Sequence, residues 1–128
     1  MRCLIVDDSA DFAEAARHLL EHGGITVVGV ASTSAEALRC FEEQRPDVTL
    51  VDVNLGSENG FDLAEQLHQS GLPAPSPVIL ISTHAEQDFT DMIATSPAIG
   101  FLGKIALTPA AIRDLVDGAV GLEECDHH

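Results

Sequence analysis

Five short apolar segments alternate with helix-like patterns along the chain, and this alternation constrains the fold more than any other feature. Each segment is bounded by turn or polar residues, which is typical of a strand buried on both faces. Strands that alternate with helices predict an α/β fold, with a parallel sheet, helices on both faces and right-handed crossovers. The five segments are Arg2–Val6, Ile25–Ala31, Val48–Val51, Val78–Ile81 and Ile99–Leu102.

Capping signals indicate where the intervening helices begin. Thr33, with Glu36 three residues later, predicts a capping box. Thr108–Pro109 predicts an N-cap followed by proline at the first helical position. Ser9 and Asp11 are both candidate caps of the first helix. The apolar residues that we expect on the inner face of that helix are Phe12, Ala15, Ala16, Leu19 and Leu20.

The chain length of 128 residues suits one compact domain. We expect this domain over residues 1–121, followed by a flexible C-terminal tail over residues 122–128. The fourth helix is expected over Glu86–Thr95 and the last one to about Val120.

No signal peptide is apparent, and the apolar runs are too short to cross a bilayer. We therefore expect a cytoplasmic protein.

The three cysteines have an odd count and no metal-like spacing, which favours free thiols in a reducing compartment. Cys125, His127 and His128 could suggest a metal site at the C-terminus. A flexible tail is the simpler interpretation of this segment.

The formal net charge is −15, from 21 acidic and six basic residues. Direct nucleic-acid binding needs clustered basic side chains that neutralise phosphates, and such clusters are missing from this sequence. The same charge argues against binding to anionic membrane surfaces. It suits a protein that attracts divalent cations.

Charged and hydroxyl side chains gather where the predicted strands end. Asp7–Asp8 follows the first strand, Asp52 the third, Ser82 the fourth and Lys104 the fifth. In a doubly wound sheet of order 2-1-3-4-5, strands one and three are neighbours at the switch point. Three carboxylates would then meet in one crevice, beside a hydroxyl and an ammonium group.

Such a cluster has a specific chemistry. Carboxylates at close range raise one another's pKa, and Mg²⁺ relieves this repulsion because it prefers carboxylate oxygens, waters and phosphate. A carboxylate beside the ion can attack phosphorus and form an acyl phosphate. Lys104 and the Ser82 hydroxyl would meet the transferred oxygens. Taken singly, Asp7–Asp8 could be a solvated helix start, Lys104 a surface lysine and Phe101 a core residue.

From residue 2 to about residue 120, the sequence resembles the receiver domain of two-component response regulators. The matching features are Leu-Ile-Val-Asp-Asp ending at Asp8, Asp52 with Gly60 eight residues later, Val-Ile-Leu-Ile closed by Ser82, and Gly-Phe-Leu-Gly-Lys ending at Lys104. The resemblance implies a flavodoxin-like, five-stranded parallel sheet of order 2-1-3-4-5 with five helices.

The resemblance also implies roles at the acidic cluster. Asp52 would be the phosphoacceptor and, with Asp8, a direct Mg²⁺ ligand. Asp7 would reach the ion mainly through water, and the backbone carbonyl of Asn54 would complete the protein ligands.

Further roles follow from the same resemblance. Ser82 would be the switch hydroxyl, Phe101 the switch aromatic and Lys104 the phosphate-sensing cation. Asn54 and His84, each two positions beyond Asp52 and Ser82, match positions that tune self-dephosphorylation in the family.

The implied function is a phosphorylation-activated switch rather than a turnover enzyme. A sensor histidine kinase or phosphotransfer protein would donate the phosphoryl group, and the surface of the fourth helix and fifth strand would signal to an unknown protein partner. The resemblance allows either a monomer or a phosphorylation-linked homodimer. One alternative is an interaction module that works independently of phosphate. Another is a phosphohydrolase of the haloacid dehalogenase type, which would have an aspartate where this chain has Asn54.

Four departures from the family pattern stand out. Gly56 and Ile105 replace prolines, Pro97 stands where glycine is usual, and Ser82 replaces the commoner threonine. The change at Ile105 leaves open the shape of the last loop, because the usual proline often carries a cis peptide bond. None of these changes removes a group that the chemistry needs.

Overall fold

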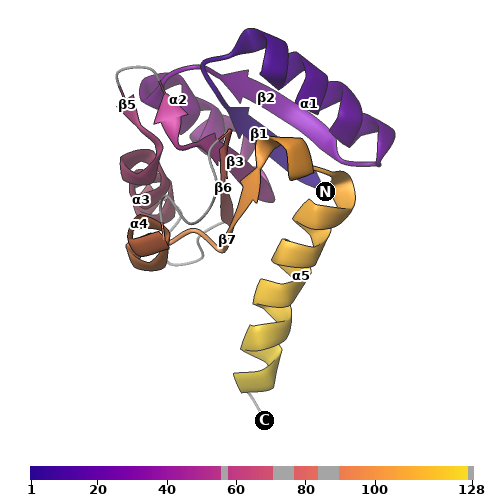
Figure 1. Cartoon of the computed structure of the whole chain (residues 1–128), viewed down its shortest axis with the longest axis vertical. Helices are drawn as coiled ribbons and strands as arrows, with labels where there is room; N and C mark the ends of the chain where they lie inside the picture. The colour runs from indigo at the N-terminus through magenta and orange to yellow at the C-terminus, as the bar shows by residue number, and fades with distance from the viewer. Residues whose placement is uncertain (56–57, 71–76, 84–89, 127–128) are drawn as a thin grey trace.

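A five-stranded parallel sheet forms the centre of the computed structural model, which describes residues 1–55, 58–70, 77–83 and 90–126 (Figure 1). The predicted strand order and α/β class are confirmed. In spatial order, the strands are β2 (Thr26–Ala31), β1 (Arg2–Val6), β3 (Val48–Asp52), β6 (Val78–Ser82) and β7 (Gly100–Gly103).

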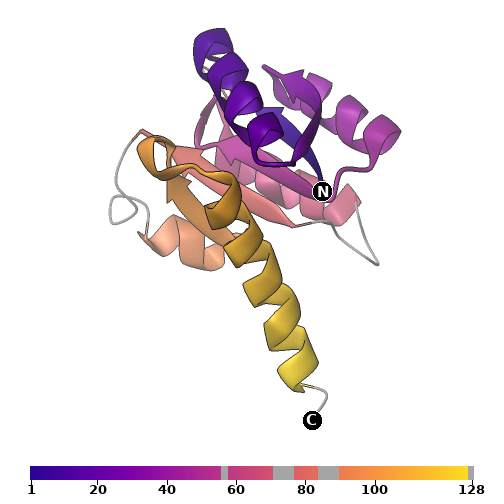
Figure 2. The same ribbon diagram turned by 90° about the vertical axis from the view of Figure 1, so that its right-hand side faces the viewer.

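Helices cover both faces of this sheet, as Figure 2 shows. Buried side chains of α1 and α5 pack on one face, whereas those of α2 and α3 pack on the other, together with partly buried Ile93 of α4. The helices of the described residues are α1 (Ala10–His22), α2 (Ser34–Gln44), α3 (Gly60–Ser70), α4 (Thr90–Thr95) and α5 (Pro109–Asp126). None of them is long and apolar enough to cross a membrane.

The central strands are mostly apolar, and both of their faces are covered by helices. In β1, Leu4 and Val6 join the core on the α2–α3 side, while Cys3 and Ile5 join the core on the α1–α5 side. Every residue of β3 is buried, including Thr49. A strand covered on both faces reads as a continuous apolar run, which is why these segments were recognisable in the sequence.

The predicted caps of α2 and α5 are confirmed. The backbone N–H of Glu36 donates to Thr33 Oγ1 at 3.2 Å, and that of Ala111 donates to Thr108 Oγ1 at 3.1 Å. Ser9, rather than Asp11, caps α1.

The expected inner face of α1 was partly wrong. Ala16 and Leu20 are buried as predicted, but Ala15 is exposed and Leu19 is 43% exposed. Ala13 takes a place in the core instead. A helix lying on a sheet buries only a narrow stripe, so residues on the flank of that stripe remain accessible even when they are apolar.

Two segments differ from expectation, and a third is described only in part. The loop after Asp52 contains a small antiparallel pair, β4 (Asn54–Leu55) with β5 (Glu58–Asn59). The described part of the fourth helix begins at Thr90, because residues 84–89 lie outside the described ranges. The last helix continues past Val120 to Asp126, into the segment expected as a tail. Leucine and glutamate after Gly121 are good helix formers, which accounts for the extension.

The start of α5 rests against the end of α1. A Cβ atom at Gly23 would collide with the ring of Pro109, so the close approach requires glycine. Arg113 Nη2 donates a hydrogen bond to the carbonyl oxygen of Gly23 at 2.5 Å. These contacts hold the connection between β7 and α5 beside the first helix.

Candidate functional site

Charged side chains meet at the carboxyl ends of three strands, as the sequence predicted. Asp7 and Asp8 follow β1, Asp52 ends β3, and Lys104 begins a short 3-10 helix, η2 (Lys104–Ala106), directly after β7. Asp7, Asp8 and Asp52 each offer an oxygen atom within 4.8 Å of the others. We call these three residues the acidic cluster.

The backbone holds Asp7 firmly, whereas Asp8 is open to solvent. Asp7 is 1% exposed, and its Oδ1 accepts a hydrogen bond from the N–H of Ser9 at 2.7 Å. Its own N–H donates to the carbonyl oxygen of Ala31 at 2.9 Å. Asp8 is exposed. The cluster therefore has a fixed inner side and an accessible outer side.

Both oxygens of Asp52 have donors. Its Oδ1 accepts a hydrogen bond from the N–H of Asn54 at 3.1 Å, and its Oδ2 accepts one from Lys104 Nζ at 3.1 Å. The Asn54 contact orients the carboxylate, because a backbone donor two residues away has little freedom to move.

Lys104 connects the acidic cluster to α1. Its Nζ lies 2.7 Å from Asp7 Oδ2, in addition to its contact with Asp52. The same nitrogen lies 4.4 Å from the centre of the Phe12 ring. Lys104 is the only lysine in the chain. The sequence analysis placed Phe12 on the inner face of the first helix and did not place it beside the site.

The electrostatics of the cluster favour a bound cation. Burial raises the pKa of Asp52, and the neighbouring Asp7 adds to this, while the Asn54 N–H and Lys104 act in the opposite direction. Burial would lower the pKa of Lys104, but its contacts with Asp7 and Asp52 outweigh this effect and raise it. One ammonium group thus faces three carboxylates. An all-oxygen donor set of this kind suits Mg²⁺.

Ser82 belongs to β6, which lies between β3, the strand that ends in Asp52, and β7, the strand that precedes Lys104. It ends β6, is 1% exposed and pairs in register with Gly103, the residue before Lys104. On the other side, β6 pairs Ile81 with Asp52. Phe101 is partly buried and packs against the core on the α2–α3 side. His84 lies outside the described residues, and Asn54 is exposed.

Gly60, which the sequence analysis singled out, confines the backbone beside Asp52. Gly60 N–H donates to the carbonyl oxygen of Val53 at 2.9 Å, and a Cβ at Gly60 would collide with the carbonyl oxygen of Asp52. Ile105, which follows Lys104, lies in the middle of η2. Gly56 lies outside the described residues.

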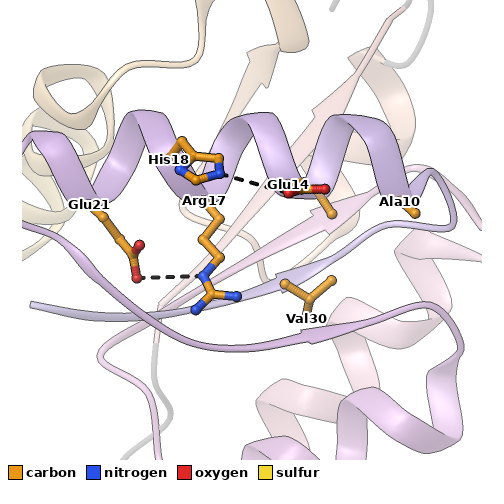
Figure 3. Close-up of a pocket in the computed structure, with 7 residues that line it drawn as sticks. Ala10, Glu14, Arg17, His18, Glu21 and Val30 are labelled. Atoms are coloured by element: carbon orange, nitrogen blue, oxygen red, sulfur yellow. Dashed lines mark ion pairs between the residues drawn. The ribbon is translucent and has the colours of Figure 1, made fainter.

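A groove of about 570 Å³ runs along α1 beside the edge strand β2 (Figure 3). Arg17 forms an ion pair with Glu21 at 3.6 Å, and His18 Nε2 lies 3.8 Å from Glu14 Oε1. No member of the acidic cluster lines this groove. It is therefore separate from the candidate site.

Comparison with known proteins points to a single family. The family model described as "Response regulator receiver domain" matches residues 3–117. The chain is 33% identical over 109 residues to protein-glutamate methylesterase/protein-glutamine glutaminase 3 of Hahella chejuensis, covering 85% of this chain and 30% of that protein. It is 25% identical over 115 residues to the transcriptional regulatory protein PdtaR of Mycobacterium tuberculosis, covering 90% of this chain and 53% of that one.

The solved structures agree with this match. The signal receiver domain of the putative response regulator NarL from Mycobacterium tuberculosis superposes with a TM-score of 0.80 at 30% identity, covering 91% of this chain and 96% of that one. The chain spans only about a third to a half of the length of the two curated relatives named above.

Proposed function

The chain belongs to the response regulator receiver family, and from this premise we propose that it is a switch controlled by phosphorylation of Asp52. The observation that carries the proposal is the placement of Lys104. Its single ammonium group bridges Asp7 and Asp52 at distances of 2.7 and 3.1 Å. This places a fixed positive charge beside the one carboxylate that ends a buried central strand, where a transferred phosphoryl group would need it.

The reaction forms one bond and breaks one bond. An oxygen of Asp52 attacks the phosphorus of a phosphohistidine or small acyl phosphate, and the bond to the donor breaks with its electron pair leaving on the donor. Mg²⁺, held by Asp7, Asp8, Asp52 and the backbone carbonyl of Asn54, would supply charge neutralisation at the phosphoryl oxygens. Lys104 contributes its ammonium to the same oxygens, and the Asn54 N–H keeps the carboxylate oriented.

Signalling would then pass through the neighbouring strands. Ser82 is buried at the end of β6 and directly follows Ile81, the register partner of Asp52, so we propose that its hydroxyl responds to a new charge at Asp52. Phe101 lies on β7 and packs toward the side of the sheet where Ile93 of α4 lies. A shift of Ser82 toward phosphate and of Phe101 inward would remodel the surface of α4 and β7.

A sensor histidine kinase or phosphotransfer protein is the proposed donor, and a protein surface is the proposed target. We propose that the chain does not turn over an external substrate. The aspartyl phosphatases considered as an alternative would have a second aspartate at the position of Asn54. In this chain the Asn54 backbone N–H already binds Asp52, and its side chain has no carboxylate to act as an acid.

The test is intact mass after incubation with Mg²⁺ and acetyl phosphate. We expect one base-labile phosphate on the native chain and none on Asp52→Ala. Asp62→Asn is the matched control, because Asp62 is an exposed aspartate in the first turn of α3, and it should accept phosphate normally. Equal labelling of Asp52→Ala would rule out the assigned phosphoacceptor.

Rapid hydrolysis could hide the product, so beryllofluoride serves as a stable phosphoryl mimic in the same series. A chain that takes neither phosphate nor beryllofluoride would support a phosphorylation-independent interaction module. Repeated release of phosphate from a small phosphoester would instead support the phosphohydrolase.

A further inference from the structure

Among the described residues, the ammonium group of Lys104 contacts two carboxylates and one aromatic ring. The carboxylates are those of Asp7 and Asp52, and the ring is that of Phe12, with its centre 4.4 Å from Nζ. A cation within about 6 Å of a ring centre is attracted by the negative face of the ring. Phe12 therefore contributes to the location of the only lysine in the chain.

The ring itself is well supported. Phe12 lies in the first turn of α1, and its N–H bonds to the Ser9 cap at 3.4 Å. Its side chain is partly buried and packs against the core on the α1–α5 side. Lysine, in contrast, has a flexible four-carbon stem that loses entropy when it is held in one position. A fixed ring beside a flexible cation is an arrangement that can position the cation.

A divalent cation in the acidic cluster would weaken the hold of the carboxylates on Lys104. The shorter contact of this lysine is with Asp7, at 2.7 Å, and Asp7 also belongs to the acidic cluster that suits a divalent cation. A cation there would compete with the ammonium for the oxygens of Asp7 and Asp52. The face of Phe12 does not compete in this way, because a hard divalent cation prefers oxygen ligands.

We propose that Phe12 is a positioning residue for Lys104, which holds the ammonium beside Asp52 when a divalent cation occupies the acidic cluster. This inference rests on the proposed function, and it adds a residue of α1 to the machinery. Phe12 acts through Lys104 and does not itself touch the phosphoryl group.

Nuclear magnetic resonance can detect the contact between Lys104 and Phe12 directly. Because Lys104 is the only lysine, labelling lysine Cε with ¹³C gives a single methylene signal from the whole chain. Protons over an aromatic ring are shifted upfield. We expect this shift in the native protein, with and without Mg²⁺, a downfield move in Phe12→Leu, and retention in Phe12→Tyr.

The matched control is Phe41→Leu. Phe41 is a buried phenylalanine of α2 in the core on the opposite face of the sheet, so its loss weakens the fold without touching Lys104. The Lys104 signal should be unchanged in this variant. An unshifted signal in the native protein, or the same signal in Phe12→Leu as in the native chain, would overturn the proposal.

The second readout is the initial rate of labelling by acetyl phosphate. We expect a fall of about 3- to 10-fold in Phe12→Leu, from the usual strength of such contacts, with recovery in Phe12→Tyr and little change in Phe41→Leu. An unchanged rate in Phe12→Leu would also overturn the proposal. A native protein that has the ring-shifted signal but takes neither phosphate nor beryllofluoride would refute the proposed function, while the contact itself would stand.

Discussion

Gly60 packs directly on the backbone of Asp52, with no room for a side chain between them. The N–H of Gly60 donates to the carbonyl oxygen of Val53 at 2.9 Å, and a Cβ atom would collide with the carbonyl oxygen of Asp52. The start of α3 thus lies against the end of β3, and it confines the backbone that carries the central carboxylate.

The first prediction follows from this contact. Gly60→Ala should lower the free energy of unfolding by about 1–3 kcal/mol, because the added methyl group must displace backbone atoms rather than a flexible side chain. Urea denaturation measures the loss. Gly118→Ala in α5 is the control, since a Cβ there meets no atom within 4 Å. That change should be neutral or stabilising by up to about 1 kcal/mol, and an equal loss in both variants would refute the steric explanation.

Asp52→Asn should stabilise the fold at neutral pH. The pKa of Asp52 is raised in the folded state, mainly by burial, so the folded state binds a proton more readily than the unfolded state does. The stability that this tighter proton binding gives is present below the unfolded pKa of 3.8. It is lost as pH rises through the folded pKa. Thermal melting should show a higher Tm for Asp52→Asn at pH 7 and a smaller difference near pH 4. A lower Tm at pH 7 would contradict this reasoning.

Alkaline pH should lower the stability of the protein through ionisation of Cys3 in the unfolded chain. Burial raises the pKa of this thiol from 9.0 to about 12, so above pH 9 the unfolded chain ionises while the folded chain does not. Stability should therefore fall by up to about 1.4 kcal/mol per pH unit between pH 9 and 12. The chain has no tyrosine and one lysine, which keeps other contributions few.

Urea denaturation between pH 8.5 and about 10.5 measures this slope. Cys3→Ala should flatten it, although the variant starts from a lower stability because it loses core volume. Cys40→Ala is the control and should keep the slope. A slope that persists unchanged in Cys3→Ala would assign the effect to another group.

Thr49→Val should stabilise the protein by about 1 kcal/mol. Thr49 is completely buried in β3, between Leu4 and Val78 on the neighbouring strands, and its hydroxyl has no hydrogen-bond partner within the described ranges. Replacing an unsatisfied buried hydroxyl with a methyl group removes its desolvation cost. Thr26→Val, at an exposed position on the edge strand β2, should change stability much less. A destabilised Thr49→Val would mean that the hydroxyl has a partner.

Mg²⁺ should raise the Tm, and chelation should reverse the increase. A ligand that binds only the folded state stabilises it in proportion to the logarithm of its concentration over Kd, by about 2.7 kcal/mol at 100 times Kd. Asp8→Asn should reduce this gain while leaving the metal-free Tm nearly unchanged, because Asp8 is exposed. An undiminished gain in Asp8→Asn would exclude Asp8 from the site.

The sequence was sufficient for the sheet and for the convergence of Asp7, Asp8, Asp52 and Lys104. Parallel strands deliver their carboxyl ends to one edge, so strand order alone brings these residues together. Which flank of α1 faces solvent was not predictable, because Leu19 and Leu20 are equally apolar and only packing separates them. The contact of Phe12 with Lys104 was missed for a similar reason. A phenylalanine in a helical stripe is normally core, and nothing local reveals a cation that arrives from the far end of the chain.

The placement of Lys104 after the last strand also has a consequence for synthesis of the chain. A ribosome delivers all three aspartates of the acidic cluster long before it delivers their counter-charge. Until β7 emerges, one edge of β6 has no partner strand, and Asp7 and Asp52 have no ammonium group between them. Addition of the closing strand therefore completes the sheet and offsets part of the negative charge of the cluster, so the nascent domain acquires its final edge and this internal counter-charge in the same event.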